Sequence, residues 1–247
     1  MTTPPLARET ASGREYYNFQ TKEAAPSVTS ILKVLSKPDV ERWKLRMAAD
    51  CANESWDEMT SWHPDERKQA MVNAHEIYTK GRADIGTLVH AVCEKIIKGI
   101  PVEVPKEAAS YIGQFGKFVM DKRPKFLESE FTVWSREFCY AGTADALAVI
   151  DGETWLLDWK SSKGAYPEFA LQLSALRQAD FLIRSDCSEE PMPQIDRMGV
   201  VHLRPRSWRL IPVKEELAAE CFIAFSAARD LFRWKDEVAG HVLGVVA

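Results

Sequence analysis

Two aspartates and one lysine near the middle of the chain have the residue types and spacing that metal-assisted phosphodiester cleavage requires. Asp145 lies in a stretch, 138–150, that predicts a β-strand, and Asp158 and Lys160 lie two apart in the next such stretch, 154–162. Residues two apart on a strand point to the same face. A short acidic, glycine-containing turn joins the stretches, so a hairpin can bring Asp145 beside the other two. Paired carboxylates suit Mg²⁺ or Mn²⁺, and a lysine can neutralise charge that develops on a phosphate.

The surroundings of Asp158 and Lys160 bear on whether these charges form a site. Alternating Asp and Lys also suits a solvated strand with surface ion pairs, and that interpretation stays open on this motif alone. The neighbours, however, are apolar: Trp155, Leu156, Leu157 and Trp159. Charges within an apolar strand are costly unless they are paired or bind a metal.

Two predicted helices carry further polar residues among apolar ones. Residues 84–98, after a break at Gly81 and Arg82, show an apolar stripe with His90 on it and Glu94 one turn later. Residues 167–184 read as an amphipathic helix that contains Gln172. A lone helical histidine is usually structural, and an interior glutamine can be a satisfied core amide, so both alternatives remain.

The ordered motifs resemble those of RecB-like nucleases of the PD-(D/E)XK superfamily, including the phage-encoded and CRISPR-associated members. The resemblance spans residues 86–176 and rests on four motifs: Gly86-Thr87-Leu88-Val89-His90, Gly142-Thr143-Ala144-Asp145, Asp158-Trp159-Lys160 and Gln172. The run from Pro26 to Leu32 also resembles the start of phage-encoded members. Each motif alone is weak, but four in the right order are specific together.

The resemblance implies a role for each matching residue. It implies a metal-ligand set of three side chains and one carbonyl: His90, Asp145, Asp158 and Trp159. Lys160 would be the catalytic lysine, acting with the two aspartates, and Gln172 would hold that lysine and the DNA end. Glu94 and Glu130 would support the site from behind the ligands.

The implied function is that of an Mg²⁺- or Mn²⁺-dependent deoxyribonuclease. The leading hypothesis is an exonuclease in DNA recombination or end processing, acting on single- or double-stranded linear ends. The alternatives are a structure-specific or site-specific endonuclease, and a non-catalytic DNA-binding module that keeps the nuclease fold. A small-molecule hydrolase fits less well, since no glycine-rich phosphate loop and no Gly-x-Ser-x-Gly elbow is present. The resemblance also suggests a phage or prophage origin and leaves room for a recombinase or helicase partner.

Two departures from the family pattern stand out. The helix motif usually reads Gln-x-x-x-Tyr, and Leu176 takes the tyrosine position, which leaves recognition of the substrate end open. Some relatives hold an iron–sulfur cluster on four cysteines, whereas the five cysteines here are scattered and form no Cys-x-x-Cys pair, so no cluster is expected.

Composition and charge place limits on the partners. The 247 residues carry a net charge of −4, which is unfavourable for a nucleic-acid enzyme unless basic residues gather locally. Three clusters do so: Lys33, Lys37, Arg42, Lys44 and Arg46; Lys117, Lys122, Arg123 and Lys125; Arg204, Arg206 and Arg209. We expect at least one to line a DNA track. Further candidate DNA contacts are Ser27, Thr29, Lys163 and Arg82, although the sequence favours plain helix capping for Ser27.

The predicted fold class is α/β (α+β), a restriction-endonuclease-like PD-(D/E)XK core in the order αβββαβ with an N-terminal helical elaboration. We expect a loosely ordered arm over 1–25, then a single nuclease domain over 26–247. Within that domain, 26–80 would be the helical elaboration and 81–247 the core with a final helix over 215–238. Scattered cysteines, no signal peptide in residues 1–20 and no membrane-length apolar run predict a cytoplasmic protein. The resemblance implies that the cell is a bacterium or a phage-infected host.

Overall fold

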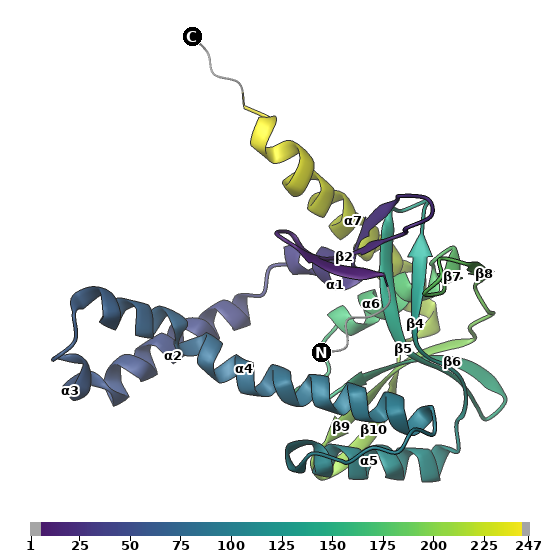
Figure 1. Cartoon of the computed structure of the whole chain (residues 1–247), viewed down its shortest axis with the longest axis horizontal. Coiled ribbons are helices and arrows are strands. Elements are labelled where there is room, and N and C mark those ends of the chain that lie inside the picture. Colours follow the sequence, from purple (N-terminus) through teal and green to yellow (C-terminus); the bar gives the residue numbers. More distant parts are fainter. Residues whose placement is uncertain (1–5, 244–247) are drawn as a thin grey trace. The chain divides into compact units, whose positions relative to one another are not determined.

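The computed structural model describes residues 6–243, and residues 80–84 by their backbone alone. The α-helices are α1 (Val28–Ile31), α2 (Pro38–Glu54), α3 (Trp56–Met59), α4 (Pro64–Ile97), α5 (Lys106–Lys122), α6 (Glu168–Arg177) and α7 (Ala218–Arg233). The strands are β1 (Ala7–Thr10), β2 (Gly13–Tyr17), β3 (Ala24–Pro26), β4 (Lys125–Ser135), β5 (Tyr140–Ile150), β6 (Glu153–Lys160), β7 (Phe181–Ile183), β8 (Glu189–Pro191), β9 (Arg197–Arg204) and β10 (Ser207–Pro212) (Figure 1). Short 3₁₀ turns at Leu32–Val34 and Glu215–Leu217 extend α1 and precede α7, and a π-helical turn at Trp234–Val238 follows α7.

A large mixed sheet forms the centre of the fold. Within the described residues it has seven strands in the order β10-β9-β6-β5-β4-β7-β8. Neighbouring strands are antiparallel except for β6 and β9, which are parallel. The predicted α/β class is thus confirmed at this level, and the predicted hairpin, β5 with β6, is present. Strand β4 pairs with the other edge of β5, and β9 and β10 form a second hairpin.

The turn between β5 and β6 fixes the register of the hairpin. Ile150 pairs with Glu153, so two residues form the loop. Asp151 and Gly152 both have positive φ, 51° and 85°. Two positive φ angles define the type I′ turn, whose twist matches that of an antiparallel pair and which Asp-Gly favours.

Helices cover both faces of the sheet at β6. Trp159 is fully buried and packs edge-on against Phe115 and Phe118 of α5. The next residue, Lys160, points the other way and contacts α6 through Gln172. Alternation along one strand therefore places α5 and α6 on opposite faces, so that β6 lies in the middle of the core.

From Ala7 onward, the segment predicted to be a loose arm is instead part of a small sheet; residues 1–5 of that prediction lie outside the described residues. Strands β1, β2 and β3 pair antiparallel in chain order. Tyr16 is 2% exposed, and its hydroxyl makes a 2.8 Å hydrogen bond with Thr143 Oγ1 of β5. Burial of Leu6, Tyr16 and Ala25 against Trp134 orders this segment.

The helix predicted to break at Gly81 and Arg82 does not break there. One helix, α4, runs through both predicted segments from Pro64 to Ile97. A glycine in a helix interior costs only about 1 kcal/mol relative to alanine, which two flanking helical segments can outweigh.

The chain divides into two compact units where a single domain was expected. Leu35–Thr87 form one, which we call the helical unit, and the described residues before and after it form the other, the sheet unit. The helical unit corresponds roughly to the predicted helical elaboration. His90 and the β-strands all belong to the sheet unit.

The helix predicted over 167–184 is shorter than expected. It ends at Arg177, and Phe181–Ile183 become β7, paired with β4. All three residues of β7 are buried. A short apolar run fits a helix or a buried strand equally well, and the free edge of β4 decided between them.

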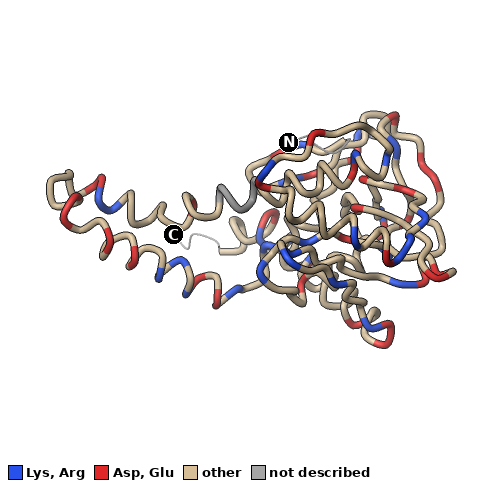
Figure 2. Tube along the Cα trace, turned by 90° about the horizontal axis from the view of Figure 1, so that it is seen from below, with Lys and Arg blue, Asp and Glu red and all other residues tan. Residues whose placement is uncertain are grey.

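Two whole-chain properties complete the description. In the described part of the chain, no helix combines the length and apolar character needed to cross a membrane. Lys and Arg residues are interspersed with Asp and Glu along the trace (Figure 2). A track for a polyanion must therefore come from local grouping of basic side chains.

Candidate metal and phosphodiester site

The candidate site lies where β5 and β6 separate. Their ladder ends at the pair Ala146–Leu157, and the next residues in register are Asp145 and Asp158. Asp145 Oδ2 accepts a 2.6 Å hydrogen bond from the Trp159 backbone N–H. The Asp145 side chain thus accepts the hydrogen bond of a β6 amide at the point where β5 diverges from β6. This hydrogen bond keeps the Asp145 carboxylate at this point of the sheet.

Asp158, Lys160 and Gln172 form a closed hydrogen-bonded group. Lys160 Nζ donates to Asp158 Oδ1 at 3.0 Å and to Gln172 Oε1 at 3.2 Å. Gln172 Nε2 donates to the same Asp158 oxygen at 3.0 Å. The predicted juxtaposition of Asp158 and Lys160 is present, and α6 supplies the third member.

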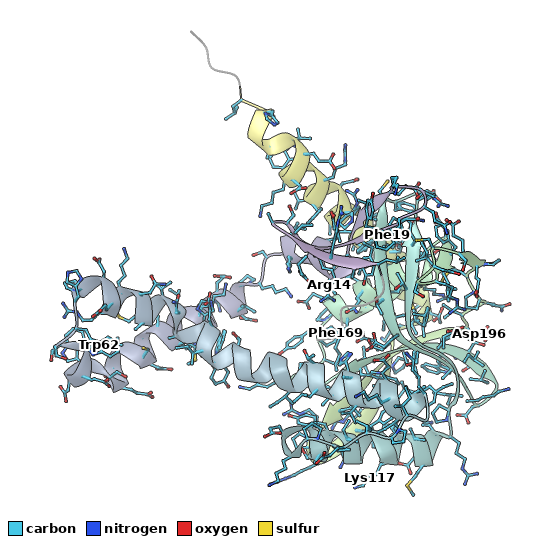
Figure 3. The ribbon with its side chains drawn as sticks, in the orientation of Figure 1. Arg14, Phe19, Trp62, Lys117, Phe169 and Asp196 are labelled. Atoms are coloured by element: carbon cyan, nitrogen blue, oxygen red, sulfur yellow. The ribbon has the colours of Figure 1, made fainter. Side chains whose placement is uncertain are left out.

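The aromatic ring of Phe169 also contacts the lysine. Lys160 Nζ lies 5.0 Å from the centre of this ring, a distance at which an ammonium is attracted to the π-face. Phe169 is on α6, one turn before Gln172, and is labelled in Figure 3. The sequence predicts only that Phe169 lies on the same amphipathic helix as Gln172.

One oxygen of Asp158 has no hydrogen bond. Asp158 Oδ2 lies 2.8 Å from Lys160 Nζ in an orientation that makes no hydrogen bond, and it is fully buried. The ion pair with Lys160 neutralises this oxygen, while its remaining lone pair has no hydrogen-bond donor.

His90, Glu130 and Asp145 form a second group beside the first. One ligand atom from each lies within 4.8 Å of those from the others. His90 Nδ1 is 3.3 Å from Asp145 Oδ1, the oxygen not used by Trp159. Two carboxylates and an imidazole are a donor set that fits a divalent cation.

Glu130 reaches this group through an irregular strand. On β4, Ser129 pairs with Ala146 and Phe131 with Ala144, which sets Glu130 opposite Asp145. Glu130 has φ +50°, in the left-handed region that non-glycine residues rarely adopt. Such strain persists only where the surrounding structure imposes it, and it is common at functional sites.

Burial and neighbouring charges displace the pKa values of the acidic groups and of His90. Burial, and then the charge of Asp145, raise the pKa of Glu130 to about 8. Burial raises the pKa of Asp158 to about 6, although Lys160 opposes this. Burial would lower the pKa of His90, but the Asp145 carboxylate outweighs it and raises that pKa to about 9.

Asp145 and Lys160 are held in their charged forms. Burial would raise the pKa of Asp145, but His90 outweighs it and holds the pKa below its usual value. Burial would likewise lower the pKa of Lys160, and Asp158 and then Asp145 reverse this. Lys160 is therefore an ammonium at neutral pH, a donor and a positive charge rather than a base.

Two further predicted site residues, Ser27 and Glu94, make contacts outside the two groups described above. Ser27 is buried and caps α1 by accepting from Ser30 N–H, while Thr29 is exposed. Glu94 pairs with Lys98 at 2.6 Å. Lys163 is exposed near the end of β6. The Arg82 side chain lies outside the described residues. The role predicted for the Trp159 carbonyl stays a prediction.

Leu176, the departure from the family pattern, is part of the core. It is 1% exposed, and a Cβ built on Gly142 would lie 2.6 Å from its Cδ2. The glycine before Asp145 is thus explained by the close approach of α6 to β5.

Sequence reasoning placed Glu130 behind the ligands, whereas the structure puts its carboxylate among them. The pairing of β4 with β5 gives this position, and no local pattern around Glu130 signals it.

Comparisons with known proteins add little to the geometry. No protein-family model and no curated protein matches the chain. Among solved structures, the chain is similar to the crystal structure of SSO0001, at 15% identity and a TM-score of 0.28. That match covers 49% of this chain and 56% of the other. A superposition this loose carries no argument about fold or function.

Proposed function

We propose that this protein is a DNA nuclease that depends on Mg²⁺ or Mn²⁺, with a PD-(D/E)XK core, and that it acts as an exonuclease in recombination or end processing. The observation that carries the proposal is the end of the β5–β6 ladder. There, Asp145, Asp158 and Lys160 lie together, and Gln172 holds the lysine against Asp158.

The order of the elements supports the same proposal. A helix precedes β4, β5 and β6, α6 follows them, and β9 then joins the sheet beside β6. This is the αβββαβ arrangement that the resemblance implies, with β7 and β8 inserted before the last strand. The elements that carry the four motifs are also those expected.

The donor set supports a resident cation. Burial, with a smaller contribution from the charge of Asp145, raises the pKa values of Glu130 and Asp158, and a bound cation would stabilise the charged forms of both carboxylates. His90, Glu130 and Asp145 would hold the cation, with Asp158 adjoining them. When bound, Mg²⁺ or Mn²⁺ lowers the pKa of water and stabilises charge on a phosphate.

The chain's own residues have distinct tasks. Trp159 N–H fixes one oxygen of Asp145 and leaves the other facing His90. Lys160 supplies a preorganised positive charge and hydrogen-bond donors for a phosphate in the transition state. Gln172 is a positioning residue, because it fixes both Lys160 and Asp158 from α6.

The test is degradation of end-labelled linear DNA, single- and double-stranded, with Mg²⁺, Mn²⁺ or chelator. We expect metal-dependent loss of linear DNA while a covalently closed circle is spared. Lys160→Ala should lower the rate about 10²–10³-fold, and Asp145→Ala and Asp158→Ala should abolish it, all with unchanged circular dichroism.

The matched control is Lys117→Ala, an exposed lysine on α5 labelled in Figure 3, which should cleave like the wild type. Cutting of the circle would replace the exonuclease with an endonuclease. Undiminished cleavage by Asp158→Ala would show that the site is wrongly assigned.

A further inference from the structure

A basic hollow lies at the ends of β6 and β9, outside the group of residues described above. Its volume is about 490 Å³, and it is lined by Lys163, His202, Arg204, Pro205, Arg206, Ser207 and Arg209. Four of these are permanently cationic. Lys163, Arg206 and Arg209 are exposed, and within the described part of the chain they have no acidic partner.

The strand register links the hollow to Lys160. In the parallel pair β6–β9, Lys160 stands beside His202, and partners in such a pair point to the same face. Arg204 is two residues further along that face, and Arg209 of β10 pairs with His202. Trp208, one residue from Arg209, faces α5 and contacts Phe118. The hollow is therefore on the face of Lys160, away from α5.

The segment after Lys160 is tied to the hollow's wall. The Ser162 carbonyl accepts hydrogen bonds from His202 Nε2 at 2.8 Å and from Arg204 Nη1 at 2.7 Å. Lys163 follows directly. One strand spacing and two residues along β9 separate Lys160 from Arg204, on the order of 10 Å, or about three base pairs of rise along the axis of a B-form duplex.

The other basic clusters have different surroundings. Arg42 and Lys44 pair with acids on their own helix. Lys117 is on α5, on the opposite face of the sheet, and Lys122 lies 3.8 Å from Asp151. Of the two clusters that lie wholly in the sheet unit, the one that contains Arg204, Arg206 and Arg209 is on the face of Lys160.

We propose that this hollow binds internal phosphodiesters of a DNA strand, so that the strand passes from the Lys160 site across β9 and β10. The choice of DNA as the polyanion rests on the proposed nuclease function. The position of the hollow follows from the strand register, and its positive charge comes from the exposed side chains of Lys163, Arg206 and Arg209. It requires no base contact, because phosphates position a strand without reading its sequence.

The experiment measures binding of a short fluorescent DNA duplex by anisotropy, with chelator throughout so that cleavage does not interfere. The test variant is Arg206→Ala/Arg209→Ala, and the matched control is Lys117→Ala/Lys125→Ala, also two exposed cations. We expect the test variant to bind at least several-fold more weakly. The slope of log affinity against log salt should fall by about 2, since each lost phosphate contact removes about 0.9.

Two further arms identify the source of the phosphate. A duplex without terminal phosphates should lose as much affinity in the test variant as one that has them, since internal phosphodiesters are the ligand. Dependence on the terminal phosphate alone would overturn the proposal. So would an equal loss of binding to polyglutamate, which would make the hollow a general anion patch.

The binding assay and the cleavage assay test the two proposals independently. A protein that cleaves no DNA but loses binding and salt slope in the test variant would keep this inference and remove the nuclease proposal. A metal-dependent nuclease whose test variant binds like the wild type and the control would remove the inference alone.

Discussion

At the scale of single residues, the site is a balance of buried charge. His90 and Lys160 carry positive charge into a region that holds Glu130, Asp145 and Asp158. Each of these five has a pKa displaced from its ordinary value by burial and by the others. Displaced pKa values concentrate at functional sites because function requires such groups to be brought together.

Glu130→Gln tests whether the carboxylate on β4 serves a cation. The amide keeps the shape of the side chain and removes the charge that burial and Asp145 disfavour. We expect the metal-free protein to gain roughly 1 kcal/mol, a rise in melting temperature of about 2–4 °C. Mn²⁺ affinity, measured by calorimetry, should fall at least about tenfold.

Glu128→Gln is the matched control for that change. Glu128 lies two residues earlier on the same strand and pairs with Arg184 at 3.0 Å. Its loss should leave Mn²⁺ affinity unchanged and should lower the melting temperature slightly or not at all. If Glu130→Gln behaved like this control, the glutamate would have only a structural role.

At the scale of elements, the site depends on how closely α6 approaches β5. α6 carries Gln172 toward Lys160 and Leu176 toward Gly142, and Tyr140 donates a 2.7 Å hydrogen bond to the carbonyl of Ala175. The same helix therefore packs against the strand of Asp145 and orients the lysine of β6. A change that pushes α6 outward should disturb both.

Gly142→Ala should have that effect. The added methyl would lie 2.6 Å from Leu176 Cδ2 and 3.2 Å from Val28 Cγ2 in a buried contact. Overpacking of this kind costs about 1–3 kcal/mol. Denaturant unfolding should show this loss, and the double variant with Leu176→Ala should be less destabilised than the sum of the two single variants.

Gly116→Ala is the control for glycine substitution as such. Gly116 is exposed on α5, and a Cβ there meets nothing within 4 Å. It should gain about 0.5–1 kcal/mol from reduced backbone freedom. Strictly additive losses in the Gly142→Ala/Leu176→Ala pair would contradict the close packing of α6 on β5.

At the scale of the whole molecule, one helix serves two units. α4 starts in the helical unit and ends in the sheet unit, where it presents His90 to Asp145. The site residues belong to the sheet unit, so a change in their charge should change the thermal stability of that unit. The raised pKa values of His90 and Glu130 connect that stability to pH.

The metal-free protein should lose thermal stability as pH rises from about 5 to 9. Folded pKa values of about 9 for His90, about 8 for Glu130 and about 6 for Asp158 all exceed their unfolded values. The folded state thus holds more protons over this range, and their contribution disappears as pH passes each folded pKa. Asp145, with a lowered pKa, contributes in the opposite sense only in acid.

Mn²⁺ should reverse this trend, because a cation replaces the protons that the ligands release. Calorimetric scans across the range, with chelator or with Mn²⁺, would show the stabilisation by metal growing with pH. A stabilisation that is the same at pH 5 and pH 9, or that shrinks with rising pH, would contradict the assignment of His90 and Glu130 as ligands.

The sequence by itself determined most of the local elements and the pairing of Asp158 with Lys160. Asp-Gly between two strand-like runs gave the hairpin, and alternation placed Asp158 and Lys160 on one face. These signals are local, since turn chemistry and side-chain period act over a few residues.

The tertiary structure alone decided what depends on contacts between distant segments. Pairing with β4 made Phe181–Ile183 a strand instead of helix, and burial beside Trp134 ordered the first strands. The β4–β5 register brought Glu130 to Asp145, and the β6–β9 register brought Lys160 to His202 and the basic hollow. Neither register can be read from a local pattern, because the free energy that sets it comes from burial across the sheet.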